Sequence, residues 1–538
     1  MRAILLLSVI VVAWGVAWGA APTASVTGGQ IRGIALEPGG AAFKGVPFAQ
    51  APVGERRWRE PGQVTPWQGI REATQFSAPC AQNAGGRPMQ NSSEDCLYLN
   101  VWTPEWPAKA RKPVMVWLHG GGNFGGTAST NNFDGEKLAR HGVVLVTVNY
   151  RLTIFGFFAH PELTRESAHH ASGNYGLVDQ IAALKWVREN IAKFGGDPGN
   201  VTLFGQSAGA VDVNVLMTSP LAKGLFHRAI AESGTVTRNP DAGSMNMTAL
   251  AVSMKVKEGP VTVSDAPALA EAERSGENVA AELKAPATGA LNFLRDLPMA
   301  DLLKVAAAPQ KSVGPANGVV ADGWVFPKAP ADVFASGQES RVPLLIGNNA
   351  RERTPPEPTD VPKAIQAMYA TLAPRAFLLY GIGAAEAPRP DPLYGSQAAQ
   401  WVVDTLYRCP VVAQLVWHAE AGNASYEYQF DRPAPGREAA GAVHGAEVAF
   451  VFGTLDEAKA SAGDRETSSA MQEYWTNFAK TGNPNGGSWP KWPKFDAAAR
   501  GYLEFTTDGP VGREGLRRPF CDLYVDNVKR LSAAQKTK

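Results

Sequence analysis

The sequence predicts an α/β fold built around a central, mostly parallel sheet flanked by helices. Three short apolar runs, at 114–118, 143–148 and 201–204, are typical of buried strands. Between the last two lies the stretch 176–194, whose apolar residues recur at roughly helical spacing. The order strand, helix, strand is the repeating unit of a parallel sheet, and it therefore predicts this fold class.

Further strands and large insertions follow these first units. Apolar runs at 342–346 and 426–430 predict two more strands. Residues 241–289 are rich in Ala and Glu and predict a helical excursion from the sheet. Because we find no internal repeat, we expect one large domain with helical insertions, covering residues 21–538.

The first 20 residues have the features of a secretory signal peptide. Arg2 supplies a positive charge, an apolar run covers 3–16, and small residues follow before Pro22. That run is short for a membrane span, which needs about 20 residues, so a membrane anchor is the less favoured alternative. No later apolar run is long enough to cross a bilayer. We expect cleavage after Gly19 or Ala20 and a secreted or periplasmic mature protein.

Four cysteines follow this segment: Cys80, Cys96, Cys409 and Cys521. An even number of cysteines behind a signal peptide favours disulfides, with four buried free thiols as the alternative. Four cysteines allow three pairings, of which Cys80 with Cys96 closes a short loop and Cys409 with Cys521 a long one. No CxxC pair is present, so the spacing is wrong for a zinc site.

The balance of charged residues limits which kinds of partner the chain is expected to bind. The chain has 51 basic and 50 acidic residues, giving a formal net charge of +1. It therefore lacks the basic excess expected for binding nucleic acid or an anionic membrane. We expect a small molecule bound by shape, while a net charge near zero leaves the oligomeric state unpredicted.

A candidate nucleophile follows the predicted strand 201–204. Residues 205–209 read G-x-S-x-G, the pattern of the sharp strand-to-helix turn in α/β-hydrolases, with Ser207 at its centre. Gly205 and Gly209 remove side chains that would clash in so tight a turn. The following helix would point its N-terminus at the reaction centre, where negative charge develops. The alternative is a Gly-rich turn with an inert serine.

Consecutive glycines at 120–122 predict an oxyanion hole. They follow the predicted strand 114–118, and glycine lets backbone N–H groups come close to a ligand. The oxyanion of a tetrahedral intermediate needs such donors. We assign this role to the N–H groups of Gly121 and Gly122 and to that of Ala208, which follows the nucleophile. The alternatives are a flexible loop or a phosphate cradle, and the latter is disfavoured because no G-x-x-x-x-G-K-[ST] pattern continues the glycines.

His444 is the predicted general base. In α/β-hydrolases the catalytic residues follow the chain order nucleophile, acid, histidine, and three histidines lie after Ser207. His227 comes too soon for an acid to precede it, and His418 lies on a helix-like run and is expected on a helix surface. His444 lies in a Gly-flanked loop after the predicted strand 426–430, where such a base belongs.

Glu352 is the predicted acid that orients this histidine. It follows the predicted strand 342–346, and it would hold one imidazole nitrogen so that the other faces Ser207. Asp322 and Asp431 are the competing candidates, and a surface carboxylate is the structural alternative.

Together these motifs resemble the type-B carboxylesterases, a family that includes cholinesterases and bacterial para-nitrobenzyl-type esterases. The matching segments cover most of the mature chain in the family's order: 43–49, 94–101, 119–122, 173–180, 194–198, 205–209 and the Gly-flanked His444. The resemblance implies an α/β-hydrolase fold and the triad Ser207, Glu352 and His444. It also implies a Cys80–Cys96 disulfide, suggests Cys409–Cys521, and points weakly to Ser233 as a supporting residue near the triad.

The chain departs from the family pattern in two places. Arg351 and Arg353 flank the acid, and such cations would favour its ionised form or bind an anionic substrate, with solvated surface charge as the preferred alternative. Cholinesterases carry a Glu before the nucleophile and a Trp in the first disulfide loop. Here Gln206 is neutral and the loop 81–95 has no aromatic residue. Because quaternary ammonium binding needs an aromatic face, the resemblance implies no cholinesterase activity.

The expected function is hydrolysis of a small-molecule carboxylic ester through an acyl-enzyme, without a metal or cofactor. A general carboxylesterase is the preferred reading. A lipase, or an esterase specialised for bulky or polyacid esters, is the alternative within the class. A catalytically dead cholinesterase-like binding protein is the alternative outside it, and it is disfavoured because the triad is complete.

Overall fold

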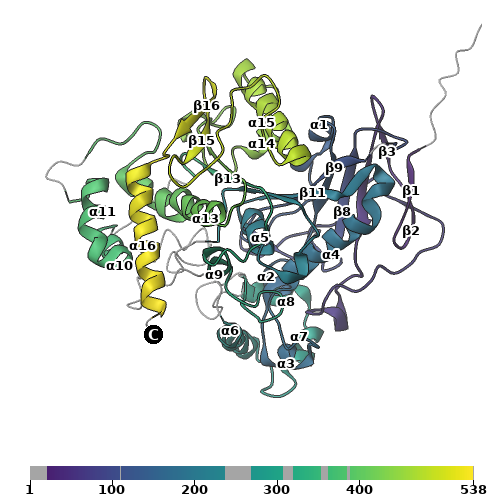
Figure 1. The fold of residues 1–538 in the computed structure, drawn as a ribbon. Helices are drawn as coiled ribbons and strands as arrows, with labels where there is room; N and C mark the ends of the chain where they lie inside the picture. The colour runs from purple at the N-terminus through teal and green to yellow at the C-terminus, as the bar shows by residue number, and fades with distance from the viewer. Residues whose placement is uncertain are drawn as a thin grey trace, which may run out of the picture.

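A large twisted sheet forms the centre of the molecule, with helices on both of its faces (Figure 1). The computed structural model describes residues 21–109, 111–236, 268–306, 319–352, 361–383 and 388–536. The predicted signal segment 1–20 lies outside the described residues, as do 241–267 of the predicted helical excursion. Helix α6 (Leu269–Glu282) accounts for part of the rest of that excursion.

In the described part of the chain, the central sheet has eleven strands in the order β16-β15-β14-β13-β12-β11-β9-β10-β8-β4-β3. Those from β10 to β15 pair in parallel, and the remaining pairs are antiparallel. This confirms the predicted mostly parallel sheet. The strands are β3 (Ile34–Leu36), β4 (Gly40–Pro47), β8 (Tyr98–Thr103), β9 (Lys112–Leu118), β10 (Val144–Val148), β11 (Gly196–Gln206), β12 (Arg228–Glu232), β13 (Leu344–Asn349), β14 (Ser425–Phe430), β15 (Gly501–Thr506) and β16 (Gly509–Glu514).

Two small sheets lie outside this centre. One joins β1 (Thr23–Val26), β2 (Gly29–Arg32) and β5 (Ile70–Glu72), and the other is the short hairpin of β6 (Asn83–Ala84) and β7 (Arg87–Pro88). That hairpin lies within the first disulfide loop.

Helices cover both faces of the sheet. They are α1 (Glu136–Ala139), α2 (Thr153–Phe157), α3 (Pro161–Glu166), α4 (Tyr175–Asn190), α5 (Ala208–Leu216), α6, α7 (Ala290–Asp296), α8 (Met299–Ala306), α9 (Pro330–Ala335), α10 (Val361–Tyr369), α11 (Ala373–Tyr380), α12 (Gln397–Val403), α13 (Cys409–Glu420), α14 (Val448–Phe452), α15 (Ala462–Thr481) and α16 (Arg518–Lys536). Figure 1 shows α10, α11 and α16 gathered at one edge, and α3, α6 and α7 together below the sheet.

The alternation of side chains along each strand explains why both faces are apolar. In β9, Val114 and Val116 pack in one core with residues of α4, while Met115 and Trp117 pack in a second core with residues of α15. Successive strand residues point to opposite faces, so a strand covered on both sides is a continuous apolar run. This is why the run 114–118 predicted a strand.

The structure contains both disulfides that the family resemblance implied or suggested. The Cys80–Cys96 bond closes a loop with a sequence separation of 16, and the Cys409–Cys521 bond joins α13 to α16 across a separation of 112. Among the helices of the described ranges, none combines the length and apolarity needed to cross a membrane.

Candidate active site

The four predicted site segments meet because they follow neighbouring parallel strands. Ser207 follows β11, the glycine loop follows β9, Glu352 follows β13, and His444 lies in the segment after β14. These strands adjoin in the order β14-β13-β12-β11-β9. The carboxyl ends of parallel strands lie at one edge of a sheet, which is where ligands bind in open α/β folds.

Ser207 occupies a strained turn between β11 and α5. Its backbone has φ 56° and ψ −121°, a combination that non-glycine residues rarely adopt. Its N–H donates to the Glu232 carbonyl oxygen (2.8 Å), which fixes the turn against the neighbouring strand. A Cβ at Gly209 would lie 2.1 Å from the Leu118 carbonyl oxygen, and one at Gly205 would lie 2.7 Å from the same atom. The two glycines are therefore required by close backbone approach.

Glu352 and His444 form a hydrogen-bonded pair. His444 Nδ1 lies 2.5 Å from Glu352 Oε2, and Glu352 Oε1 accepts the backbone N–H of Asn349 at 2.8 Å. The backbone also joins the two residues, because the His444 N–H donates to the Glu352 carbonyl oxygen (2.6 Å). Glu352 is buried, with φ 29°, so its unusual backbone is held by these bonds on both sides.

The two competing carboxylates have other partners. Asp322 accepts the side-chain amide of Asn174 (2.8 Å) and the backbone N–H groups of Trp324 and Phe326 (3.0 Å each), so it closes a turn. Burial raises the pKa of Asp431 to about 8, and its hydrogen bond with Glu504 adds to that effect. An acid that is neutral at pH 7 could not stabilise an imidazolium.

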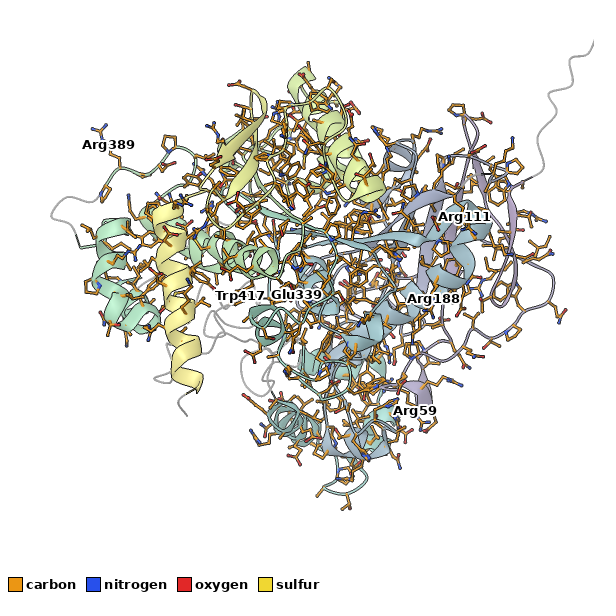
Figure 2. The ribbon with its side chains drawn as sticks, viewed as in Figure 1. Arg59, Arg111, Arg188, Glu339, Arg389 and Trp417 are labelled. Carbon is orange, nitrogen blue, oxygen red and sulfur yellow. A yellow bond between two sulfur atoms is a disulfide. The ribbon has the colours of Figure 1, made fainter. Side chains whose placement is uncertain are left out.

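The other two candidate histidines are structural. His227 Nδ1 accepts the Val201 N–H at 3.1 Å. His418 was expected on a helix surface, and this is wrong, because it is 0% exposed. Its ring nitrogens lie 2.8 Å from Glu339 Oε1 and 2.9 Å from the Val342 carbonyl oxygen. Figure 2 marks Glu339 in the interior of the molecule, near the middle of the view. A partly polar helix can still bury a histidine that has a carboxylate partner.

Gln206 holds the second nitrogen of His444. Its side-chain Nε2 lies 3.2 Å from His444 Nε2, whereas no hydrogen bond joins Ser207 Oγ to His444 among the described residues. Because Nδ1 faces a carboxylate, it carries the proton, and Nε2 is the acceptor of a Gln206 N–H. The structure thus brings Glu352 and His444 together, and it places the His444 ring against Gln206, the residue that precedes Ser207 in the chain.

The glycine loop lies against Ser207 with free donors. Gly121 and Gly122 have φ of 112° and 68°, and a Cβ at Gly120 would lie 2.9 Å from the Ser207 Cβ. Within the described ranges, the N–H groups of Gly121, Gly122 and Ala208 donate to no other protein group. These three N–H groups are therefore available to an oxyanion, and their role as the oxyanion hole stays a prediction.

Buried polar contacts hold the two ends of this loop. The Tyr150 hydroxyl donates to the His119 carbonyl oxygen (2.6 Å), and the two rings stack with centroids 4.5 Å apart. Asn123 Nδ2 donates to Asp212 Oδ1 (3.2 Å), which lies in the first turns of α5. The loop is thus connected to the helix that begins at the nucleophile.

Further carboxyl groups lie buried behind the pair of Glu352 and His444. Burial raises the pKa of Glu232 to about 8 and that of Glu447 well above its usual value, the latter also through the charges of Glu232 and Glu352. Trp475 Nε1 donates to Glu232 Oε1 (2.8 Å). Burial thus favours the neutral form of both carboxyl groups and reduces the negative charge that they place next to the site.

Ser233 lies at the end of β12, between the strands that carry Ser207 and Glu352. It is fully buried, and its N–H donates to the Gly347 carbonyl oxygen (2.8 Å). Its hydroxyl makes no hydrogen bond with the triad within the described part of the chain. Its weakly predicted supporting role stays a prediction.

Of the two arginines that flank Glu352 in the sequence, only Arg351 can be followed in the structure. Arg351 donates to the carbonyl oxygens of Pro392 (2.7 Å) and Leu393 (3.0 Å), so its guanidinium holds a loop. Arg353 lies outside the described residues. Among the residues that are described, no cluster of three His, Cys, Asp or Glu side chains is arranged to hold a metal ion.

Tyr407 is a site neighbour that the sequence analysis missed. Its ring centroid lies 5.4 Å from that of His444, and it belongs to a π-helical turn, Asp404–Arg408, between α12 and α13. The adjacent Arg408 donates to the Ala350 carbonyl oxygen at 2.8 Å, which ties this turn to the segment that carries Glu352. A π-helical turn often occurs at a functional site, but it has no sequence signature.

Comparison with known proteins finds relatives that are named as esterases or as an acyl-CoA hydrolase. A model of the carboxylesterase family matches residues 20–523. The chain is 34% identical to the fumonisin B1 esterase of Sphingopyxis macrogoltabida, with 88% of this chain and 84% of that protein covered. It is 37% identical to the precursor of a medium-chain fatty acyl-CoA hydrolase of Anas platyrhynchos (96% and 93% covered) and 35% identical to carboxylesterase 1D of Mus musculus (91% and 90% covered).

The fold comparison agrees with these sequence matches. A solved structure of PNB esterase superimposes with a TM-score of 0.77 at 30% sequence identity, and the match covers 93% of this chain and 99% of that one. The similarity therefore extends over nearly the whole described structure.

Proposed function

The chain belongs to the carboxylesterase family and is a carboxylic-ester hydrolase, and we propose that Ser207, His444 and Glu352 carry out its reaction. One observation carries this assignment: the buried Glu352 carboxylate bonds His444 Nδ1 at 2.5 Å, beside a serine in a strained turn. This arrangement leaves Nε2 as the basic nitrogen, on the side of the nucleophile.

In the first step, His444 exchanges its Gln206 partner for the Ser207 hydroxyl when substrate binds, as catalytic hydrogen bonds often tighten in the complex. Nε2 takes the hydroxyl proton while Ser207 Oγ forms a bond to the ester carbonyl carbon. The negative charge on the carbonyl oxygen is stabilised by the N–H groups of Gly121, Gly122 and Ala208. Collapse of this intermediate breaks the ester C–O bond, and His444 returns the proton to the leaving alcohol.

In the second step, water replaces the alcohol. His444 Nε2 takes a proton from water, whose oxygen attacks the acyl carbon and forms a second tetrahedral intermediate in the same oxyanion hole. Its collapse breaks the bond to Ser207 Oγ, which recovers its proton from His444, and the carboxylic acid leaves. Glu352 stabilises the imidazolium in both steps without accepting its proton.

The first test is Ser207→Ala. We expect this variant to lose hydrolysis of p-nitrophenyl butyrate by about 10⁴-fold or more while its thermal unfolding is unchanged. Ser219→Ala is a matched control, because Ser219 is also buried but donates to the Val325 carbonyl oxygen (2.7 Å). Full activity in Ser207→Ala would overturn the assignment of Ser207 as the nucleophile. A wild-type protein that neither hydrolyses these esters nor is labelled at Ser207 by an organophosphate probe would instead favour a non-catalytic binding protein.

For the substrate, we propose a general carboxylesterase. Relatives named for fumonisin B1 and for medium-chain fatty acyl-CoA support testing both compounds beside p-nitrophenyl esters of short and long acyl chains. Comparable kcat/KM across the simple esters supports a general enzyme. A strong preference for fumonisin B1 would replace this with a specialised esterase, and a strong preference for long acyl chains with a lipase.

Two disulfides fit a protein that folds in an oxidising compartment. With the apolar segment 3–16, they support the proposal that the chain is exported and that its signal peptide is removed.

A further inference from the structure

Gln82, in the first disulfide loop, binds the glycine loop with both ends of its amide. Its Nε2 donates to the Gly126 carbonyl oxygen (2.8 Å), and its Oε1 accepts the Gly126 N–H (2.9 Å). Gln82 is buried, and a side chain that satisfies both backbone groups of one residue fixes that residue's position and orientation. Both backbone hydrogen-bonding groups of Gly126 are thus paired with the Gln82 amide, in the way that neighbouring β-strands pair.

Gly126 in turn lies directly against the start of the glycine loop. Its φ is 109°, and a Cβ added there would lie 2.4 Å from the Gly120 carbonyl oxygen and 2.5 Å from His119 Nδ1. Within the loop, Phe124 and Gly125 donate back to the Gly121 carbonyl oxygen (3.1 Å each). Movement of Gly126 would therefore move the peptide units that carry the Gly121 and Gly122 N–H groups.

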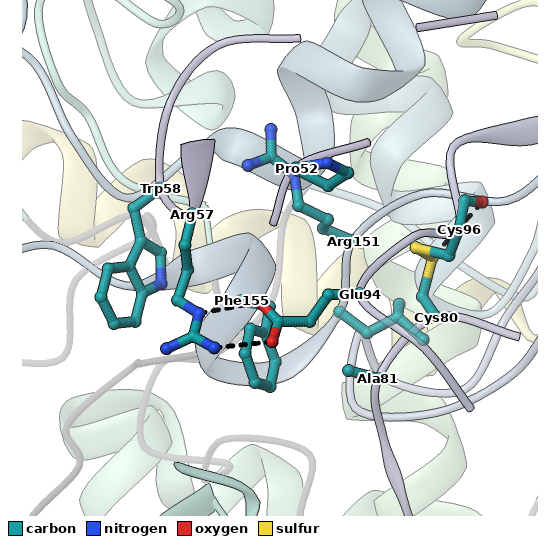
Figure 3. A pocket seen from close by; sticks show the side chains of 10 residues that line it. Pro52, Arg57, Trp58, Cys80, Ala81, Glu94, Cys96, Arg151 and Phe155 are labelled. Atoms are coloured by element: carbon teal, nitrogen blue, oxygen red, sulfur yellow. Dashed lines mark hydrogen bonds and ion pairs between the residues drawn. A yellow bond between two sulfur atoms is a disulfide. The ribbon is translucent and has the colours of Figure 1, made fainter. Parts of the chain in front are cut away.

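The other side of Gln82 is anchored by the disulfide loop. Its Nε2 also donates to the Cys80 carbonyl oxygen at 3.0 Å, next to the Cys80–Cys96 bond. Near Cys96, Glu94 pairs with Arg57 through two short bonds of 2.7 and 2.6 Å, as Figure 3 shows. Both side chains are largely buried, so this pair is a rigid support for the base of the loop.

We propose that Gln82 is a positioning residue that holds the oxyanion hole in its reactive geometry, with the Cys80–Cys96 loop as its support. This proposal rests on the oxyanion-hole assignment made above. Oxyanion donors act mainly on the tetrahedral intermediate, where the charge is larger than on the ester carbonyl. Loss of the Gln82 contacts is therefore expected to lower kcat more than it raises KM.

The test compares Gln82→Met, which has a similar shape but no hydrogen bonds, with the neighbouring Asn83→Leu. Asn83 is a matched control because it lies in the same loop but donates to the Leu303 carbonyl oxygen (2.8 Å), away from the glycines. For p-nitrophenyl butyrate, we expect Gln82→Met to lower kcat about tenfold or more with little change in KM. We expect Asn83→Leu to keep the wild-type kcat.

A trifluoromethyl ketone provides a readout that a purely structural role would not change. The Ser207 oxygen adds to its carbonyl carbon while His444 takes the serine proton, and the C=O π electrons move to the oxygen, which becomes an oxyanion in the hole. The affinity of the ketone should therefore fall in Gln82→Met in proportion to kcat/KM. The corresponding methyl ketone forms little adduct, so it should bind the wild-type protein and Gln82→Met with equal affinity. Gln82→Glu retains the acceptor for the Gly126 N–H, and it should give an intermediate kcat if Gln82→Met does not fold.

The outcomes separate the two proposals. If the wild-type enzyme forms no adduct at Ser207, the proposed catalytic site is wrong. If it forms the adduct, but kcat and ketone affinity in the Gln82 variants equal those of Asn83→Leu, the site stands and the role of Gln82 is overturned.

Discussion

At His444 the two ring nitrogens have different partners, and this asymmetry defines the chemistry. Glu352 binds Nδ1 and Gln206 binds Nε2, so a neutral ring has its proton on Nδ1. The Gln206 amide thus occupies the lone pair that, in the mechanism we propose, takes the serine proton once substrate is bound. A neutral donor can be displaced from that nitrogen by the serine hydroxyl.

Glu352→Gln tests the role of the acid. The amide can present an N–H to Nδ1, which favours the tautomer with its proton on Nε2 and removes the basic lone pair. We expect kcat for p-nitrophenyl butyrate to fall about 10⁴-fold, with the fold retained. The measurement is kcat per folded molecule, together with circular dichroism.

Asp322→Asn is the control for that substitution, because Asp322 was the competing acid in the sequence. We expect it to destabilise the protein by about 1–3 kcal/mol, because an amide NH2 group in place of Oδ2 cannot accept the Asn174 side-chain N–H, while kcat per folded molecule stays at the wild-type level. A large loss of kcat in Asp322→Asn, with normal activity in Glu352→Gln, would reverse the assignment.

Local motifs lead to the candidate site residues but not to the contacts around them. The turn at Ser207 and the close approach of the glycines could be predicted, because such geometry restricts which residues fit. The burial of His418 could not, since its Glu339 partner comes from a segment 79 residues away in sequence. The contacts of Tyr407 and Gln82 are likewise tertiary, and neither residue type has a local signature for them.

At the scale of elements, the turn from β11 to α5 packs backbone against backbone. Gly209→Ala would place a methyl group 2.1 Å from the Leu118 carbonyl oxygen, in the strand that leads into the glycine loop. We expect the free energy of unfolding to fall by about 1–3 kcal/mol, which lowers the melting temperature of a chain of this length by about 1–3 °C, with a loss of kcat. Differential scanning calorimetry and steady-state kinetics would measure both.

Gly199→Ala is the matched control within β11. The nearest atom to a Cβ there is Asp197 Oδ1 at 3.4 Å, the end of a flexible side chain. We expect little change in melting temperature or activity. Equal effects of the two substitutions would contradict the close packing of the turn.

The order and type of the core elements followed from apolar patterning. The runs at 114–118, 143–148 and 426–430 lie in or overlap β9, β10 and β14, since strands covered on both faces are apolar throughout. Element ends were less predictable: the run 201–204 is only part of β11, and the helical pattern 176–194 divides into α4 and a 3-10 turn, Ile191–Phe194. Ends depend on backbone bonding, which hydrophobicity does not encode.

At the scale of the whole molecule, the buried carboxyl groups of Glu232 and Glu427 form no ion pair with any residue that the structure describes. Glu427 lies in β14 between two parallel strands, and its carboxyl oxygens make no hydrogen bond with the described residues. Burial raises its pKa to about 8, as it does for Glu232. Folding therefore keeps protons on these groups that the unfolded chain would release at neutral pH.

This linkage predicts that stability falls as the pH rises from about 4.5 to 8. In that window the folded protein holds the Glu427 proton and the unfolded chain does not, so each such group lowers the free energy of unfolding by about 1.4 kcal/mol per pH unit. Below the window both states are protonated, and above it both are ionised. Glu427→Gln removes one titrating group, so its stability relative to wild type should increase with pH across the window. Urea unfolding between pH 5 and 8 measures this, with the exposed Glu420→Gln as control, and parallel curves for Glu427→Gln and wild type would contradict it.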